Sequence, residues 1–252
     1  MTLAGIMTFG LILITPPTLL LADAGKLSGA TVGLMAVIGC TNVVGLRIEY
    51  LALRRGKVGV VVPIVSTDGA IAAVIAVVAG LHLAVRTALL LVVVSAGVVL
   101  AGATPDPPQM PDPGRRVRSG VLALLAAVLF GVNLYVTGHL GRSVSVLWLL
   151  LPARLVGTAV IAGPLAVQGP PWPRGRVLAL LATAGLAEVL GIISYTAGAR
   201  HQLAVAAVLA SQFAALTTVG AYFVFGERLN RGQIAGLVTV AVGVGLLAGG
   251  GA

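Results

Sequence analysis

Residues 61–80 read VVPIVSTDGAIAAVIAVVAG, and this stretch decides which class of protein the chain belongs to. Apart from Ser66, Thr67 and Asp68, its residues are apolar or small. An α-helix needs about 20 such residues to cross the hydrocarbon core of a bilayer. The stretch therefore predicts a transmembrane helix that carries one acid near its middle.

The composition of the whole chain supports this interpretation. Of its 252 residues 58% are hydrophobic and only 9% are charged, whereas soluble domains carry about 25% charged residues. The net charge of +9 would suggest nucleic acid as the partner of a soluble protein. Here the Lys and Arg residues lie mainly in short gaps between apolar runs, as in the basic loops that orient a membrane protein. We therefore expect an integral membrane protein in the lipid bilayer, with no nucleic acid as a partner.

Apolar runs separated by charged residues or by Pro and Gly predict an all-α integral membrane fold with nine transmembrane helices. The first run lacks the positive region of a cleaved signal peptide, so we interpret it as a membrane helix. The predicted helices cover residues 2–22, 28–50, 58–80, 84–102, 118–138, 144–167, 176–199, 203–225 and 231–249.

The two halves of the sequence are related by a shift of 145 residues. This shift pairs Tyr50 with Tyr195, Arg55 with Arg200, Ser66 with Ser211 and His82 with Glu227. It also superimposes three consecutive helices of each half. Internal repeats of this kind are the usual construction of secondary transporters. We predict a first repeat over residues 1–102, a Pro-rich linker over 103–117, and a second repeat over 118–252.

The predicted repeats differ in one helix. The helix at 118–138 opens the second repeat and has no counterpart in the first, so we expect five helices per repeat with the first helix of repeat one missing. Because five is odd, two successive repeats would enter the membrane in opposite orientations. The prediction is an inverted repeat.

Two acids lie in segments that are predicted to cross the hydrocarbon core of the bilayer. Asp68 and Glu188 lie near the middle of their apolar runs, where a charged side chain costs about 2.5–3.5 kcal/mol on insertion scales. Such acids persist when they face a wet cavity, where they can carry protons or bind a cationic substrate. Asp68 also has a local interpretation, because it could cap a half-helix that begins at Gly69.

Further polar residues are candidates for the same cavity. Asn42 lies nearly opposite Glu188 under the repeat shift, and Asn133 and Tyr135 flank the middle of the unpaired helix. Arg154 is either functional or paired at depth, or it reaches the interface along its aliphatic stem. The single cysteine, Cys40, is expected to be a small buried hydrophobic residue.

The C-terminal segment FGERLNRGQIAGLVTVAVGVGLLAGG resembles the closing motif of the EamA repeat in the drug/metabolite transporter superfamily. The motif residues are Gly226, Glu227, Gln233, Gly236 and Gly243. The stretch LPARLVG at 151–157 is similar to the arginine-bearing helix of the same repeat. The Gly236/Gly243 and Gly243/Gly245 spacings suit close helix packing. In the first half, His82 replaces the motif glutamate. The resemblance implies a carrier of metabolites, amino acids, sugars or drugs.

We expect a multi-pass secondary transporter of the cell (inner) membrane, a monomer or homodimer, that exports a small molecule by alternating access. Protons are the coupling ion considered. No cofactor or metal is expected, and no ATP site is found. The alternatives are an intramembrane enzyme, which single rather than clustered acids disfavour, and a non-transporting scaffold or truncated fragment.

Overall fold

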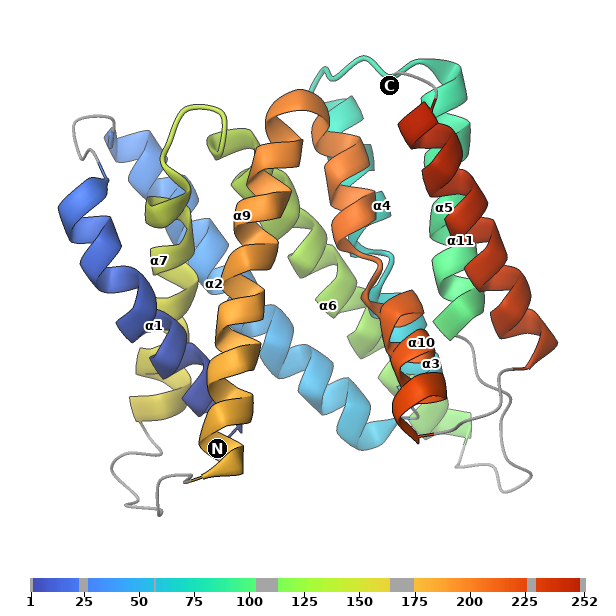
Figure 1. Cartoon of the computed structure of the whole chain (residues 1–252), viewed down its shortest axis with the longest axis horizontal. Helices are drawn as coiled ribbons and strands as arrows, with labels where there is room; N and C mark the ends of the chain where they lie inside the picture. Colours follow the sequence, from blue (N-terminus) through green and yellow to red (C-terminus); the bar gives the residue numbers. More distant parts are fainter. Residues whose placement is uncertain are drawn as a thin grey trace. The chain divides into compact units, whose positions relative to one another are not determined.

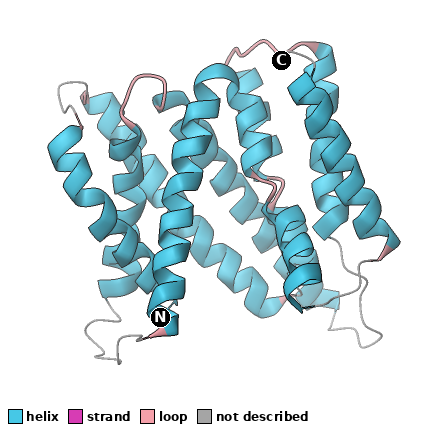
Figure 2. Cartoon of the chain, viewed as in Figure 1, coloured by secondary structure: helices cyan, strands magenta, loops and turns pink. Residues whose placement is uncertain are grey.

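The computed structural model describes residues 2–22, 27–56, 58–102, 113–163, 175–225 and 230–249, and within these ranges every regular element is a helix (Figures 1 and 2). The helices are α1 (Thr2–Leu21), α2 (Gly29–Arg55), α3 (Val58–Val65), α4 (Asp68–Val78), α5 (Val85–Gly102), α6 (Pro113–Leu140), α7 (Val146–Gly157), a π-helical segment (Thr158–Ala162), α9 (Arg176–Ala210), α10 (Phe213–Phe225) and α11 (Arg231–Gly249).

Among the described residues, six helical stretches are long and apolar enough to cross a membrane, and two shorter helices are also apolar. Helices satisfy their backbone groups internally, which a chain must do in hydrocarbon. The predicted all-helical membrane protein agrees with this result. The count of nine spans and the inverted repeat stay predictions.

Several helix boundaries differ from those predicted. The run at 58–80 is two helices, α3 and α4, separated by a turn at Ser66 and Thr67. The boundary predicted between residues 199 and 203 is a kink within α9, where Gln202 has a non-helical φ of −142°. Helix α6 begins at Pro113, inside the predicted linker, and proline is well suited to a first helical position. The linker residues 103–112 lie outside the described ranges.

The chain forms two compact units, each drawn from both halves of the sequence. Unit 1 comprises Met1–Val43 and Val136–His201, and unit 2 comprises Val44–Tyr135 and Gln202–Ala252. Helices α2, α6 and α9 contribute residues to both units. The kink at Gln202 coincides with the point where α9 passes from one unit to the other.

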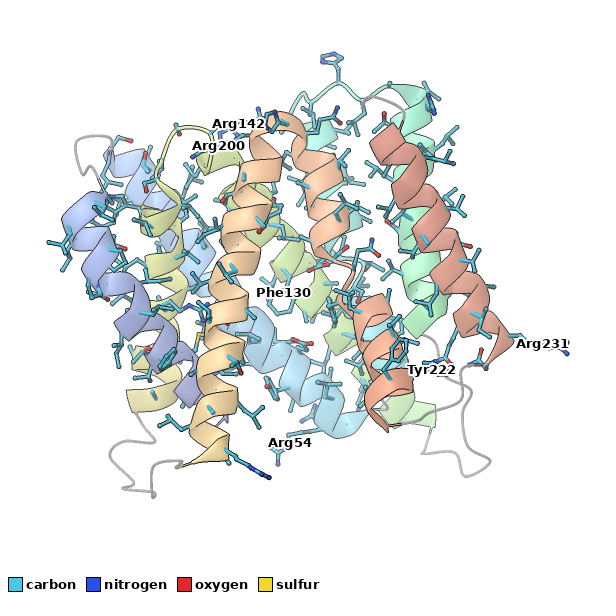
Figure 3. The ribbon with its side chains drawn as sticks, viewed as in Figure 1. Arg54, Phe130, Arg142, Arg200, Tyr222 and Arg231 are labelled. Atoms are coloured by element: carbon cyan, nitrogen blue, oxygen red, sulfur yellow. The ribbon has the colours of Figure 1, made fainter. Side chains whose placement is uncertain are left out.

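In unit 1, α1 packs against α7 and against the π-helical segment that follows it. Ile14, Leu150 and Val189 form a buried apolar cluster. The close approach depends on glycine: a Cβ on Gly157 would lie 2.8 Å from the sulfur of Met7. At one end of the unit, the Nε of Arg200 donates a hydrogen bond of 2.8 Å to the carbonyl of Gly141 (Figure 3).

In unit 2, the most extensive packing is between α5 and α11, which lie side by side (Figure 1). A Cβ on Gly236 would overlap the amide nitrogen of Ala101 and lie 2.7 Å from the carbonyl oxygen of Gly97, and a Cβ on Gly243 would lie 2.5 Å from Val94. The predicted close packing is therefore confirmed at Gly236 and Gly243 but not at Gly245, where a Cβ would have no atom within 4 Å. Residue numbers fall along α11 as they rise along α5, so the two helices are antiparallel.

Unit 2 also contains two helix breaks with the same backbone hydrogen bonds. In each break the first N–H donates to the carbonyl four residues earlier, and the second donates to the carbonyl three residues earlier. An N–H group in the first turn of the following helix then donates a hydrogen bond to the carbonyl of the second break residue. The bonds are Ser66 to Val62 (2.9 Å), Thr67 to Ile64 (3.1 Å) and Ile71 to Thr67 (3.0 Å), and Ser211 to Ala207 (3.1 Å), Gln212 to Leu209 (3.4 Å) and Leu216 to Gln212 (3.0 Å).

The expected burial of Cys40 is wrong, because this residue is exposed on α2. Free cysteine is usually buried in a soluble protein because its thiol behaves as a small hydrophobic group. On a membrane helix the outer surface is apolar too, so the same preference does not require burial inside the protein.

Candidate functional site

Arg154 is the centre of a polar site in unit 1. It lies on α7 among apolar residues, and only 1% of the residue is exposed. Its guanidinium fits because α1 carries a glycine at the facing position: a Cβ on Gly10 would lie 2.9 Å from Nε and 3.1 Å from Cζ. Arg154 is therefore enclosed within the protein, and its functional role stays a prediction.

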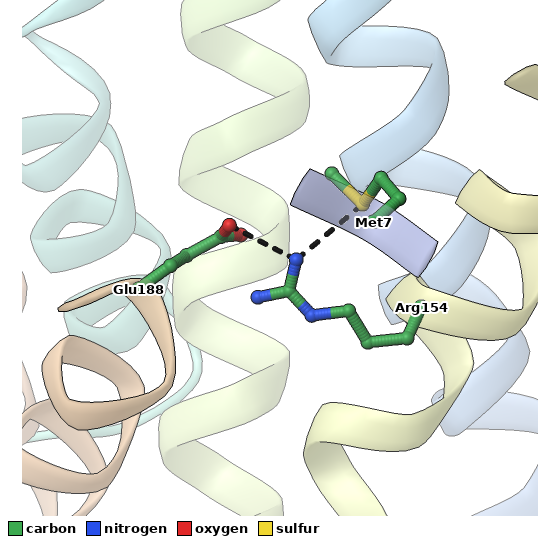
Figure 4. Close-up of polar contacts among 3 residues, drawn as sticks. All are labelled: Met7, Arg154 and Glu188. Atoms are coloured by element: carbon green, nitrogen blue, oxygen red, sulfur yellow. Dashed lines mark hydrogen bonds and ion pairs between the residues drawn. The ribbon is translucent and has the colours of Figure 1, made fainter. Parts of the chain in front are cut away.

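The partner of Arg154 is Glu188 on α9 (Figure 4). The Nη1 of Arg154 lies 2.9 Å from the Oε2 of Glu188 and 3.4 Å from the sulfur of Met7. A buried arginine must be paired, because an uncompensated charge in a low-dielectric interior costs several kcal/mol. The ion pair therefore ties α7 to α9, and the thioether of Met7 brings α1 to the same guanidinium.

The two partners of the pair differ in exposure. The side chain of Glu188 is 35% exposed, while that of Arg154 is 1% exposed. Within the described residues, the Nε and Nη2 atoms of Arg154 are buried without a hydrogen-bond acceptor. The carboxyl group of Glu188 is thus partly at the surface of the described helices, whereas the guanidinium is enclosed by them.

Asn42, the residue predicted to lie opposite Glu188, is on the part of α2 that belongs to unit 1. Its side-chain oxygen is buried and accepts no hydrogen bond from the described residues. A buried amide oxygen without a donor loses the free energy of its hydration. Asn42 is therefore an available acceptor in the same unit as the ion pair.

Asp68 lies in unit 2 and is the first residue of α4, with 8% of the residue exposed. Its Oδ1 accepts a hydrogen bond of 2.8 Å from the N–H of Gly69. The N-cap position is occupied by Thr67, not by Asp68. Asp68 therefore does not cap the helix as predicted but lies in its first turn. A negative charge there is stabilised by the helix dipole.

The helix break beside Asp68 packs directly on the second break. A Cβ on Gly69 would overlap the carbonyl oxygen of Ala207 and the hydroxyl of Ser211, and would lie 2.8 Å from the Cα of Val208. Only a glycine permits this approach of two backbones. The two breaks of unit 2 are therefore neighbours in space as well as equivalents in sequence.

Helix α6 reaches the same region with a third glycine. A Cβ on Gly131 would lie 3.0 Å from the carbonyl oxygen of Asp68 and 2.7 Å from Ile71. The predicted site residues Asn133 and Tyr135 follow on α6, where both are half-buried and engaged with other groups. Of the six predicted site residues, unit 1 holds Asn42, Arg154 and Glu188, and unit 2 holds Asp68, Asn133 and Tyr135.

An apolar groove of about 810 Å³ lies between α4 and α5 in unit 2. Thr67 and Ser95 are the hydroxyl-bearing residues of its lining, and the other lining residues are alanine, valine and leucine. The hydroxyl of Thr67 already donates a hydrogen bond of 2.7 Å to the carbonyl of Ile64. The groove thus offers apolar surface beside the helix break.

The C-terminal motif has a structural role that our sequence analysis did not predict. Gly226 and Glu227 lie outside the described residues. The Oε1 of Gln233 accepts from the N–H of Asn230 (3.0 Å), and the Oδ1 of Asn230 accepts from the N–H of Gln233 (2.9 Å). This reciprocal arrangement is a capping box at the start of α11. An Asn followed by Gln three residues later was the available signal.

The fold and the family of this chain follow from three comparisons with known proteins. A solved structure described only as "Crystal structure of protein" matches with a TM-score of 0.72 at 15% identity, covering 98% of this chain and 85% of that chain. At this identity the match establishes the fold alone. No curated protein sequence matches the chain. The model of the EamA-like transporter family matches residues 118–249, just over half of the chain. With its apolar helices, the chain is a multi-pass membrane transporter and belongs to the EamA-like transporter family.

Proposed function

We propose that the protein is a secondary carrier that exports a small metabolite, amino acid or drug across the inner cell membrane, driven by the proton gradient. The observation that carries this proposal is the ion pair of Arg154 and Glu188 within apolar helices of a transporter-family protein. Ionisable residues inside a membrane are costly and usually mark a substrate or ion pathway.

We further propose two inverted repeats of a five-helix unit, residues 1–102, which lack the first helix of the unit, and residues 118–252, joined by the linker. Two observations support this architecture. The breaks at Ser66 and Ser211 have the same backbone hydrogen bonds at a constant separation of 145 residues. The helices α5 and α11, equivalent under this shift, pack antiparallel, which an inverted repeat requires. Alternating access would then arise when one repeat rocks against the other, which exchanges two arrangements related by a pseudo-two-fold axis in the membrane plane.

In this mechanism the proton acts at Glu188. When a proton binds the carboxylate, the negative charge that compensates Arg154 is lost and the contact of 2.9 Å between Nη1 and Oε2 weakens. The buried guanidinium is then left without a counter-ion, which is unfavourable in a low-dielectric interior. Protonation therefore favours a conformation in which α7 and α9 separate. Release of the proton on the other side of the membrane restores the pair.

Asp68 has a different proposed role, because no ion pair to it is formed by the described residues. Its buried carboxyl group, with Asn133 and Tyr135 on the adjoining helix α6, would recognise a cationic or amine-bearing group of the substrate. A positive charge brought by the substrate would compensate the carboxylate, as an opposite charge does for any buried acid.

The test is transport by the purified protein in proteoliposomes with an imposed pH gradient. A growth screen of an overexpressing strain against metabolites and drugs first supplies the substrate. We expect Glu188→Gln to reduce gradient-driven transport at least tenfold while binding persists, and Asp68→Asn to weaken substrate binding. Thr183→Ala on α9 is the control, because Thr183 is exposed and its hydroxyl donates to the carbonyl of Leu180 on the same helix (3.0 Å), so transport should be unchanged.

Unchanged transport in both site variants would rule out these roles. Turnover of a membrane lipid without any gradient would favour the intramembrane enzyme instead. Folded protein that moves none of the compounds to which overexpression confers resistance would favour the scaffold.

A further inference from the structure

Glu49 is an acid of unit 2 that the proposed mechanism does not use. It lies on α2, is half-buried, and has Gly45 four residues before it and Ala52 three residues after it. A Cβ on Gly45 would lie 2.8 Å from the ring of Phe130 on α6 (Figure 3). Ala52 is fully buried in a cluster that includes Ala126, also on α6. Residues three and four apart share one face of a helix, so Glu49 lies on the face of α2 that packs against α6.

Asp68 approaches the same stretch of α6 from α4. A Cβ on Gly131, the residue after Phe130, would lie 3.0 Å from the carbonyl oxygen of Asp68. The carboxyl groups of Glu49 and Asp68 are close enough to interact electrostatically. Two acids from different helices thus lie beside one segment of α6, within unit 2.

Within the described residues, neither acid forms an ion pair with a basic side chain. The carboxyl group of Asp68 accepts a hydrogen bond from the N–H of Gly69. Arg47, two residues before Glu49, is exposed and lies about 200° around α2 from it. Two like charges in a low-dielectric interior repel each other, and a positive charge relieves that repulsion. The two carboxyl groups therefore favour the binding of a cation.

A buried amide adds an oxygen acceptor to this region. Gly69 packs against Val208, whose Cα would lie 2.8 Å from a Cβ on Gly69. The Nε2 of Gln212 donates a hydrogen bond of 3.0 Å to the carbonyl of Val208. The Oε1 of Gln212 is buried and accepts no hydrogen bond from the described residues. An ammonium group has three donors and no acceptor, so it is the kind of cation that this set of oxygens can bind.

Packing alone does not account for the two acids. The shift of 145 residues relates Glu49 to Ser194 and Asp68 to Phe213, so neither equivalent position carries an acid. Acids within a membrane span are costly and usually have a functional role. Glu49 is therefore a candidate for the same role as Asp68.

We propose that Glu49 is a second substrate-binding carboxylate beside Asp68, and that the site selects compounds with two positively charged amino groups. This inference rests on the proposed function, in which Asp68 binds a cationic group, and it narrows the substrate class from an amine to a diamine. One ammonium group compensates Asp68 and the other compensates Glu49. A compound with a single ammonium group leaves one acid without a counter-charge, and that acid must then hold a proton.

The test is equilibrium binding of linear diamines of increasing chain length, each compared with the monoamine of the same chain length. The purified protein is titrated by calorimetry at neutral pH in nanodiscs of zwitterionic lipid, because anionic lipid would itself attract amines. Empty nanodiscs serve as the blank. The net charge of +9 disfavours non-specific binding of cations to the protein. We expect the best diamine to bind at least tenfold more tightly than its monoamine.

Two variants test whether this preference comes from Glu49. Glu49→Gln should weaken binding of the diamine about tenfold, which is about 1.4 kcal/mol, and leave binding of the monoamine nearly unchanged. Glu49→Asp keeps the charge and should retain the preference for the diamine. Thr183→Ala, at an exposed position of α9, is the control and should bind both amines as the unaltered protein does.

Three results would overturn the inference. Equal affinities of the unaltered protein for diamine and monoamine would do so without any variant, so a folding defect in Glu49→Gln cannot hide a failure. A preference that persists in Glu49→Gln would remove Glu49 from the site. Tighter binding of Mg²⁺ than of any diamine, lost in Glu49→Gln, would make a metal ion the ligand.

Failure of this inference is distinguishable from failure of the proposed function. Binding is measured without a gradient, whereas the proposed function is tested by gradient-driven transport that depends on Glu188. Transport that still depends on Glu188 and Asp68, together with no preference for diamines, would remove only the role of Glu49.

Discussion

The helix breaks at Ser66–Thr67 and Ser211–Gln212 have the same backbone hydrogen bonds but are followed by different side chains. Both turn the chain with the same set of hydrogen bonds, and Ser66 and Ser211 are both buried. After the first break comes Asp68 followed by Gly69, whereas after the second comes Phe213 followed by Ala214. The backbone of the break is thus maintained while the residues just beyond it differ.

This difference distinguishes a residue that packing requires from a residue that packing does not require. Gly69 is needed because its backbone touches Ala207 and Ser211 of the other break, a purely steric requirement. Asp68 has no such requirement, since Phe213 occupies the equivalent position without an acid. An acid that packing does not demand, and that hydrocarbon disfavours, is best explained by the ligand or ion it binds. The ion pair of Arg154 and Glu188 is a second such departure, because Val43 occupies the position equivalent to Glu188.

The largest expected effect comes from breaking the ion pair. Glu188→Gln leaves the guanidinium of Arg154 buried and uncompensated, which costs about 3–5 kcal/mol for a fully buried pair. Because Glu188 is 35% exposed, we expect a loss of unfolding free energy near the lower limit, about 3 kcal/mol. The measurement is unfolding in mixed micelles followed by circular dichroism.

The double variant Arg154→Met with Glu188→Gln tests whether this loss comes from the charge. Replacing both charged partners removes the uncompensated guanidinium, so most of the lost stability should return. Thr183→Ala, at an exposed position of α9, serves as control with a change below about 1 kcal/mol. If the double variant is less stable than either single variant, the pair contributes through packing and not through charge compensation.

The second-largest expected effect concerns the contact between the two breaks at Gly69. Gly69→Ala places a methyl group against the backbone of Ala207, and overpacking of this kind costs about 1–3 kcal/mol. The reverse change at the equivalent position, Ala214→Gly, removes a buried methyl group without a clash and costs about 1 kcal/mol through added backbone freedom. Thermal unfolding of both variants measures the difference. Equal losses would mean that the breaks do not meet at Gly69.

The smallest effect concerns the starts of α5 and α11. Gln233→Ala removes one half of the capping box and should cost about 1 kcal/mol. The equivalent residue of α5 is Ala88, and Val85 stands where α11 has Asn230. Ala88→Gln has no reciprocal cap to join, so we expect a change within about 0.5 kcal/mol. Hydrogen exchange of the first turn of each helix reports the change locally, and a stabilised α5 in Ala88→Gln would contradict this reasoning.

Much of the fold could be predicted because its signals are local. Runs of apolar residues indicated the helices, and Pro and the Ser-Thr-Asp sequence after Val65 marked an irregular segment. The break expected between residues 199 and 203 coincides with the kink at Gln202. The start of α6 at Pro113 was missed because proline, which was taken to exclude a helix, is compatible with a first helical position.

The candidate site could be predicted less completely. Sequence indicated that Arg154 and Glu188 were unusual, since each is a charge in an apolar run, but it did not pair them. The pairing needs α7 and α9 side by side with Gly10 opposite the guanidinium, and these relations arise from packing. The capping box of Asn230 and Gln233 is different, because its spacing was readable in the sequence.

The sequence by itself determined that this chain is a membrane protein and that a few ionisable residues occur within its apolar helices, because hydropathy is a property of neighbouring residues. Only the tertiary structure decided which charges meet, that the two breaks touch through Gly69, and that candidate residues divide between two units. Those outcomes depend on the directions of side chains and on close contacts between distant helices, for which the order of residues along one helix carries no information.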